Sequence, residues 1–375
     1  MRERSLIVKR LLICILICLN ALSYGNDLGL VDFNGQLRIG YIYTKAGSEE
    51  SSKGVGFGGS LHMEKSLLRS LTAGLTFYTV NSLGFDAHPE FYGSDEDGIS
   101  MVSEAYGKYI AKGWSLKGGR FLIDTPHADS DDIRMIPNAF EGVEGVYESN
   151  GSKIVFAHLS KMAGWESGDE ISSFKPLYQV LGLKRKTDGM NILGIAYSDY
   201  ELWLYNIDEI ANVLYMQAGY IFDEFSVNIQ ADLARDTGSA LLGEIQSDLF
   251  GMMVQYDMSH LHLSVALNRV FGDTAAIFSF GGGPYFTSME DQTIDAAGKD
   301  AKAYTFGMEY EYEDFVFGVA AGKFEGDRYK TTETDLSLSA TLTKNAHFEC
   351  VYAKVDDRID DGDLDLFRII MKYSF

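Results

Sequence analysis

One group of charged side chains in this 375-residue chain lies between residues 124 and 138. The segment holds four aspartates, one arginine and two prolines, and it carries its own apolar pair, Met135 and Ile136. Such a segment reads as a structured loop that packs against a wall and places its charges beside a passage, where they would select among ions. The candidate constriction residues are Asp124, Asp129, Asp131, Asp132 and Arg134, with Arg120 at the end of the preceding segment.

The other side chains that could act as nucleophiles, general bases or metal ligands do not form a catalytic or metal-binding pattern. His262 and Ser264 share one face of a predicted strand, but no acidic partner or acyl-chain site accompanies them. His260 and His262 lack the spacing of a metal site, and the glycines of 281–283 lack the strand, helix and lysine of a phosphate-binding loop. We therefore expect no enzyme, no catalytic residue, no metal site and no cofactor.

Two acidic runs, at 94–97 and 356–363, leave one alternative open. Clustered carboxylates suit Ca²⁺, and divalent ions would also bridge them to anionic lipopolysaccharide. Neither run fits the EF-hand pattern, because Ile359 would occupy a ligand position. A loop-bound Ca²⁺ and simply solvated loop charge both remain as interpretations.

The elements that must position these charges are strands. In 366–375 the residues Phe367, Ile369, Met371, Tyr373 and Phe375 alternate with polar ones, which gives one apolar face and one wet face. This pattern suits the last strand of a transmembrane β-barrel better than an edge strand of a soluble sandwich. Tyr373 and the terminal Phe375 resemble the signal that outer-membrane barrels present to their assembly machinery.

Segments of about ten alternating residues fill the chain beyond residue 30. Long and short connections alternate between them, and this predicts a transmembrane antiparallel β-barrel with short periplasmic turns and long extracellular loops. The eighteen expected strands are 33–44, 54–64, 70–80, 99–111, 113–122, 140–149, 152–160, 177–186, 190–198, 209–221, 224–235, 247–258, 260–270, 302–312, 314–324, 333–342, 345–355 and 366–375.

The parity of each strand separates a lipid face from a lumen face. A barrel of 16–18 strands is wide enough to hold water, so polar side chains on the inner parity imply an aqueous lumen. Arg120 shares the parity of Leu116, which faces lipid, and only a bulge near Gly118 and Gly119 would turn it inward. The residues expected to line the lumen are Arg38, Glu104, Lys108, Asp232, Glu309 and Glu349.

The N-terminus predicts export. Basic residues precede a short apolar run over 11–22, so 1–25 reads as a secretory signal peptide cleaved after Ser23 or Gly25, followed by one barrel domain over 26–375. Removing four basic residues and one acidic residue changes the formal charge from -22 to -25. This acidity argues against nucleic acid as a partner and favours attraction of cations. Cys350 is then the only cysteine, so no intramolecular disulfide is expected.

Three stretches carry a family resemblance. The run from Gly119 to Gly142, the opening 32–41 and the strand 210–218 resemble the OprD-like porin family, and the first of these is the specific one. The resemblance implies an 18-stranded outer-membrane porin, often trimeric, in which the third loop (123–139) folds inward as the constriction. Members that take up carboxylates tend to show a ladder of lumen arginines, and this chain has few.

These observations favour a bacterial outer-membrane porin for passive diffusion of ions and small hydrophilic solutes, with a preference for cations. The expected partners are outer-membrane lipid and lipopolysaccharide, the barrel assembly machinery, cations and small solutes, and a homotrimer. Two alternatives stay open: a barrel-anchored adhesin or ligand-binding protein, and a substrate-specific channel for small carboxylates.

Overall fold

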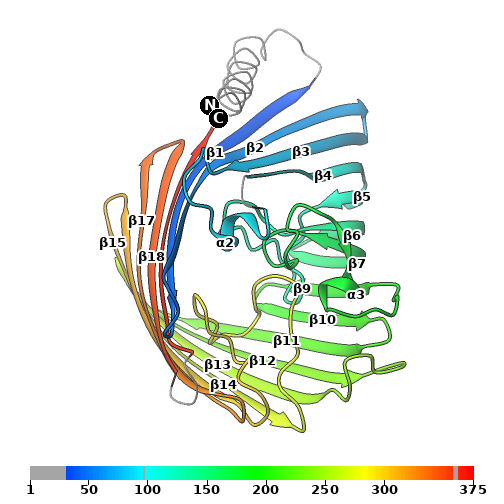
Figure 1. Cartoon of the computed structure of the whole chain (residues 1–375). Helices are drawn as coiled ribbons and strands as arrows, with labels where there is room; N and C mark the ends of the chain where they lie inside the picture. Colours follow the sequence, from blue (N-terminus) through cyan, green and yellow to red (C-terminus); the bar gives the residue numbers. More distant parts are fainter. Residues whose placement is uncertain (1–30, 96–97, 358–361) are drawn as a thin grey trace.

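The computed structural model describes residues 31–95, 98–357 and 362–375, and its strands close into a single antiparallel barrel (Figure 1). Nineteen strands are assigned, and β8 has only two residues, so eighteen strands build the wall. The barrel closes because β1 pairs with both β2 and β19. The elements are β1 (Asp32–Ala46), β2 (Ser52–Leu68), β3 (Leu71–Asn81), α2 (Pro89–Tyr92), β4 (Gly98–Ala111), β5 (Trp114–Phe121), β6 (Ala139–Ser149), β7 (Ser152–Ala163), β8 (Lys175–Pro176), α3 (Leu177–Val180), β9 (Met190–Tyr197), β10 (Tyr200–Ile207), β11 (Ala211–Phe222), β12 (Phe225–Asp236), β13 (Gln246–Met258), β14 (Leu261–Gly272), β15 (Lys302–Tyr312), β16 (Phe315–Glu325), β17 (Lys330–Thr343), β18 (Ala346–Asp357) and β19 (Leu364–Ser374).

The eighteen-strand barrel was predicted correctly, but one strand was wrongly placed. The segment 177–186 is not a strand: it begins with α3 and lies in the long connection between β7 and β9. The expected loop 199–208 is instead β10, which pairs with β9 and β11 along its whole length. The two errors cancel in the count. Ser198 begins the tight turn between β9 and β10 with a left-handed φ of 51°.

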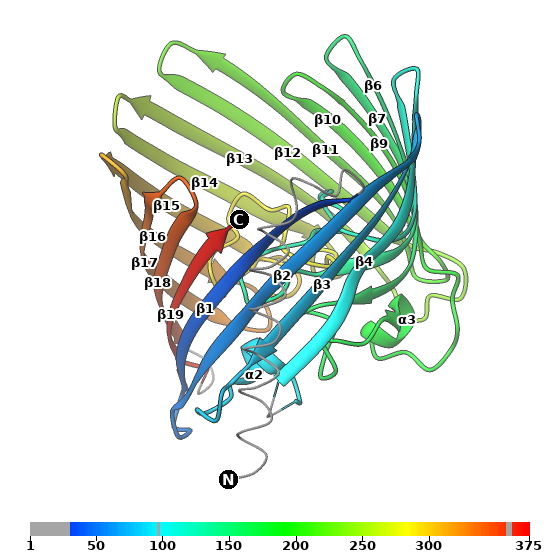
Figure 2. The same cartoon turned by 90° about the horizontal axis from the view of Figure 1, so that it is seen from above.

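Turn chemistry explains why one end of the barrel is tight. The two-residue turns after β4, β6 and β15 begin at Lys112, Asn150 and Glu313, whose φ angles are 51°, 50° and 54°. A positive φ at this position gives the turn a twist that matches the twist of the flanking strands. Short and long connections alternate along the chain, so the long connections lie at the end of the barrel opposite to these tight turns, as Figure 2 shows.

The two faces of the wall follow the parity rule. On β15, Tyr304, Phe306 and Tyr310 point outward and are each 45–48% exposed. On β1, Leu37 and Ile39 are both 50% exposed, whereas Arg38 between them is 3% exposed because it points into the lumen. Large apolar side chains that remain exposed around a closed barrel indicate a lipid-facing surface.

Several long connections fold into the barrel rather than away from it. Loop 3 (122–138) and loop 7 (273–301) lie within the ring of strands, together with α2 from the β3–β4 connection (Figure 1). Loop 3 docks through Met135 and Ile136, which are 0% and 1% exposed beside Phe91 of α2. Gly40 of β1 makes room for this contact, since a Cβ there would lie 2.7 Å from the Met135 sulfur. Burial of side chains of this size is worth about 1.5–3 kcal/mol each.

Some sequence-based expectations fall outside the described residues. The predicted signal peptide 1–25 is one, and parts of both acidic runs, 96–97 and 358–361, are others. No group of three or more potential metal ligands is found in the described part of the chain. None of the helices in that part is long and apolar enough to cross a membrane. Cys350 is a free, half-buried thiol.

Candidate pore constriction

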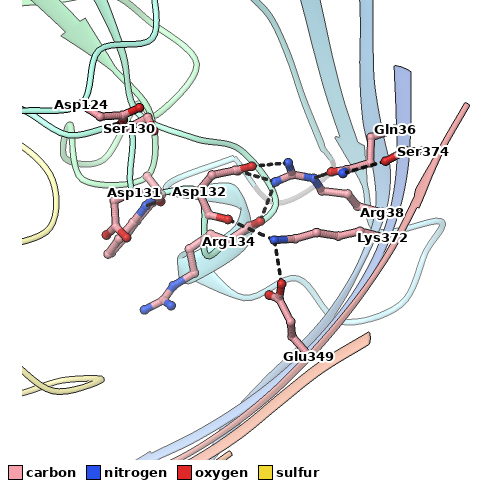
Figure 3. A network of polar contacts seen from close by, with 11 residues as sticks. Gln36, Arg38, Asp124, Ser130, Asp131, Asp132, Arg134, Glu349, Lys372 and Ser374 are labelled. Carbon is pink, nitrogen blue, oxygen red and sulfur yellow. Dashed lines mark hydrogen bonds and ion pairs between the residues drawn. The ribbon is translucent and has the colours of Figure 1, made fainter. Parts of the chain in front are cut away.

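Loop 3 is tied to the barrel wall by an ion pair between Asp132 and Arg38 of β1 (Figure 3). Arg38 Nη1 and Nη2 each donate to one carboxylate oxygen of Asp132 at 2.6 Å, and Nη1 also donates to the Arg134 carbonyl at 2.9 Å. Lys372 of β19 donates to the Asp132 carbonyl at 3.2 Å and to Glu349 at 3.3 Å. Bidentate guanidinium–carboxylate geometry fixes orientation as well as distance, so the loop has one register on the wall.

Arg134 joins loop 3 to two other inward segments. Its Nε donates to Glu90 of α2 at 2.7 Å and its Nη1 donates to Glu290 of loop 7 at 3.2 Å. The guanidinium carbon lies 4.4 Å from the centroid of the Trp165 ring. Glu290 also pairs with Arg368 of β19, so one carboxylate serves two arginines. Arg134 is only 4% exposed, so its guanidinium is neutralised by these partners and is not accessible to a solute in the lumen.

The opposite end of loop 3 is held by a buried polar cluster. His127 Nε2 lies 2.8 Å from a carboxylate oxygen of Asp232 on β12, and Tyr285 of loop 7 donates to the same oxygen at 3.0 Å. His127 Nδ1 lies 3.2 Å from the Phe278 carbonyl. The neighbouring backbone of Asp129 donates to the Phe280 carbonyl at 2.9 Å. Loops 3 and 7 thus form one layer across the lumen.

The four aspartates predicted for the constriction have different surroundings. Asp124 caps a turn by accepting from the Ser130 backbone and hydroxyl, and Asp129 accepts from the Asp131 backbone at 2.6 Å. Asp132 is the wall anchor described above. Asp131 has a left-handed φ of 39° and lines a cavity in the lumen of about 600 Å³. The structure brings all four into one loop, but only Asp131 of these lines that cavity.

Arg120 does not join this group. β5 pairs in continuous register with β4 and β6, and the nearest register shift lies between Glu141 and Gly142 of β6. The bulge that would turn Arg120 inward is therefore absent from β5, although Gly119 has a φ of 125°. Arg120 donates to Glu141 at 3.1 Å and lies 4.3 Å from the Phe174 ring. The prediction that Arg120 belongs to the constriction is not supported by these contacts.

The structure places the other expected lumen residues as follows. Glu104 accepts from Thr76 at 2.5 Å and lies 3.9 Å from His62, which is on the same inner face. Lys108 is half-buried four residues further along β4, on the parity of Glu104. Glu309 lines the cavity described next.

A cavity of about 600 Å³ lies between the inward loops and the strands from β13 to β18. Seven carboxylates line it, and no lysine or arginine does. Glu290 is paired with arginines, and Asp257 lies 2.7 Å from His262, the single imidazole of the lining. Among the residues described, the other five have no ion pair with a basic group. They are Asp131, Glu166, Asp291, Glu309 and Asp335.

The loop carboxylates in this cavity are held in a partly dry environment. Burial, with the nearby Asp131 charge, raises the pKa of Glu166 to about 7. Burial and the neighbouring Asp129 raise the pKa of Asp131, and Arg134 opposes the shift. Glu166 therefore changes charge near neutral pH, where ordinary carboxylates stay ionised.

Sequence reasoning missed several of these residues. Glu166, Glu290 and Asp291 come from loops without an obvious motif, and Asp335 lies on the strand expected over 333–342. One feature of the sequence did point to them. The polar face of the last strand carries Arg368 and Lys372, and basic side chains that face the lumen predict acidic partners there. His262, considered with Ser264 as a catalytic pair, instead contacts Asp257 and lies 3.6 Å from Glu311.

A closed, lipid-facing barrel whose third loop folds into a polar lumen defines the class of outer-membrane porins. Comparison with family models gives one match, the outer membrane porin, OprD family, over residues 104–322. This is more than half of the chain, which therefore belongs to the OprD family of outer-membrane channels. No curated protein sequence matches the chain.

Solved structures agree on the fold. OccK9 (OpdG) of Pseudomonas aeruginosa aligns with a TM-score of 0.79 at 15% identity and covers 92% of this chain and 98% of its own. OpdK of the same organism, solved with vanillate, aligns with a TM-score of 0.78 at 16% identity and the same coverage. OccAB2 of Acinetobacter baumannii aligns with a TM-score of 0.78 at 18% identity, again with 92% and 98% covered.

Proposed function

We propose that this porin passes cations in preference to anions, and that the layer formed by loops 3 and 7 is its constriction. The observation that supports this is the cavity lining, which holds seven carboxylates and no lysine or arginine of the described residues, and five of those carboxylates have no ion pair with a basic group. Fixed charge of one sign in a narrow, partly dry passage attracts counter-ions and repels co-ions.

The arginines of the lumen do not offset this charge. Arg38, Arg134 and Arg368 are 3%, 4% and 7% exposed, and each is paired with a carboxylate. They act as anchors for the inward loops rather than as ligands for a passing anion. For this reason the geometry gives no support to a channel for small carboxylates.

Reversal potentials of the refolded protein in a planar bilayer under a KCl gradient test the proposal. We expect the sign that reports K⁺ preference, and a smaller potential for Asp131→Asn. Asparagine tolerates the left-handed backbone at this position, so the loop should keep its shape. Glu49→Gln, in the exposed β1–β2 loop, is the matched control and should change nothing. Anion preference of the folded wild type would reject the proposal.

The remaining expectations about targeting belong to the same proposal. Removal of residues 1–25 would leave the barrel over 26–375, and Tyr373 and Phe375 would present the assembly signal. Phe375 is bound to β1, since its backbone exchanges two hydrogen bonds of 3.0 Å with Gly35. Tyr373 is 44% exposed on the outer face. Lipopolysaccharide, the assembly machinery and a homotrimer stay as proposed partners.

A further inference from the structure

We infer that the solutes best suited to this lumen are linear organic diamines without a carboxylate, and this inference rests on the proposed cation preference. It goes further because it separates three kinds of solute that a cation-preferring pore could pass: inorganic cations, amines, and amino acids that carry both charges. Three features of the lumen support it: acids without a basic partner, apolar lining residues, and arginines that are already occupied by carboxylates.

The first step concerns two lining acids that have no ion pair with a basic group of the described residues. Asp335 of β17 is 9% exposed and lines the cavity. Its Oδ2 accepts a long hydrogen bond of 3.3 Å from the Glu290 backbone, and its carboxyl group also contacts the Glu333 side chain. Glu309 lines the same cavity, is exposed and has no ion pair among the described residues, so an ammonium group in the cavity can donate to it.

The second step is the spacing of the acids along the wall. Asp257, His262 and Glu309 stand in one cross-strand row on β13, β14 and β15. Neighbouring strands are about 4.8 Å apart, so the Cα atoms of Asp257 and Glu309 are about 10 Å apart. Asp335 lies two strands beyond Glu309, in the row of Gly307. A chain with an amine at each end can approach two such acids at once, whereas a single point charge pairs with one.

The third step concerns the apolar part of the lining. Ile133 of loop 3, Trp165 of loop 4 (164–189) and Met289 of loop 7 all border the same cavity. Methylene groups gain free energy when they leave water for such surfaces, by about 0.8 kcal/mol for each fully buried group. A hydrated K⁺ ion gains nothing from them. Apolar side chains set among acids therefore favour an organic cation.

The fourth step excludes a carboxylate on the solute. A carboxylate that enters the cavity would meet five acids without a basic partner and no lining lysine or arginine. The nearest arginines are buried against their own acids, and Lys372 already contacts Asp132 and Glu349. Discrimination here comes from repulsion and missing partners rather than from size.

Bi-ionic reversal potentials against K⁺ test this inference with two matched solutes, 1,4-diaminobutane and ornithine. Ornithine is 1,4-diaminobutane with one added carboxylate, so the pair isolates the group in question. We expect 1,4-diaminobutane to be several-fold more permeant than ornithine. Glu309→Gln and, separately, Asp335→Asn should reduce this ratio, whereas Glu49→Gln should not. Two acidic positions are tested because Asp335 is buried and Glu309 is more accessible.

The outcomes are distinguishable. K⁺ preference together with equal permeation of the two amines, or with better permeation of ornithine, would overturn the diamine inference and leave the proposed function standing. Anion preference in KCl would overturn both. A diamine advantage that Glu309→Gln and Asp335→Asn leave intact, in variants that retain the heat-modifiable gel mobility of a folded barrel, would also overturn it, because the lining acids would then not be its cause.

Discussion

Replacing Asp132 by asparagine should loosen loop 3 more than removing Arg38, although the two residues form the same ion pair. The reason is their unequal burial: the Arg38 side chain is 2% exposed and the Asp132 side chain 38% exposed. Asp132→Asn leaves a guanidinium buried without its counter-charge. Arg38→Met leaves a carboxylate that water can reach.

The magnitudes follow from this asymmetry. Removing one partner of a fully buried ion pair costs about 3–5 kcal/mol, and partial exposure of Asp132 reduces this to about 2–3 kcal/mol. For Arg38→Met the loss is about 1–2 kcal/mol, which is the net worth of the hydrogen bonds that disappear. Each 1.4 kcal/mol is a factor of ten, so opening of the loop should increase roughly 30- to 140-fold in the first variant and roughly 5- to 30-fold in the second.

Amide hydrogen exchange on the protein in nanodiscs measures this opening. The informative amides are those of Asp129 and Asn138, which donate to Phe280 and Ser130 when the loop is docked. Local opening governs exchange of such amides when reclosing is fast. The double variant should resemble Arg38→Met, because no buried charge is left unpaired. Faster exchange in Arg38→Met than in Asp132→Asn, or unchanged exchange in both, would refute the reasoning.

Three further predictions concern the lumen and assembly. Burial raises the pKa of Glu166 to about 7, so its ionised fraction falls from about 0.9 at pH 8 to about 0.1 at pH 6. The K⁺ preference measured from reversal potentials should therefore weaken from pH 8 to pH 6. A K⁺ preference that does not change with pH would contradict this role of Glu166. His127→Phe removes the imidazole contacts to Asp232 and to the Phe278 carbonyl and leaves Tyr285 as the donor to Asp232, so the free energy of unfolding should fall by about 1–3 kcal/mol, measured as a lower melting temperature than that of wild type. Phe375→Ala should lower the amount of heat-modifiable barrel in outer-membrane fractions without changing total synthesis, and equal amounts would argue against an assembly signal.

The fold could be predicted because the two faces of a membrane barrel meet different solvents. Each strand must alternate, and the alternation in 302–312 or 366–375 is therefore visible in the sequence. The misplaced strand shows where this rule weakens. In 177–186 a short helix buries Leu177, and Leu181 and Leu183 in the loop after it pack against the same core cluster, so apolar residues two apart in sequence imitate a strand. β10 was missed because the prediction made 199–208 a long loop, whereas Ser198 and Asp199 form a tight turn and β10 follows at once.

The site was predicted only in part, for a different physical reason. Loop 3 could be recognised because its charges, prolines and apolar pair are contiguous. Its partners Glu90, Glu290 and Trp165 come from three other connections, and nothing local in the sequence says which loops turn inward. The sequence also does not show which arginines face the water of the lumen and which are buried in ion pairs. Whether Arg134 lines the pore or is buried depends on acids that lie 44 and 156 residues away in sequence.

These ion pairs between the inward loops and the barrel wall also explain why the lining of the lumen carries a net negative charge. An inward loop can be held by an ion pair only if both charges of the pair lie inside the barrel, and the pairs of Arg38 and Arg368 use basic side chains from the wall and acids from the loops. The chain has 32 basic and 54 acidic residues, and the inward-facing arginines Arg38 and Arg368 are occupied in this way. Acids in excess of the anchors then remain to face the water. The contacts that narrow the pore to a constriction therefore also leave its lining acidic. An arginine added to the lining without a partner, for example by Ser337→Arg on β17, should shift the selectivity toward anions without loosening loop 3.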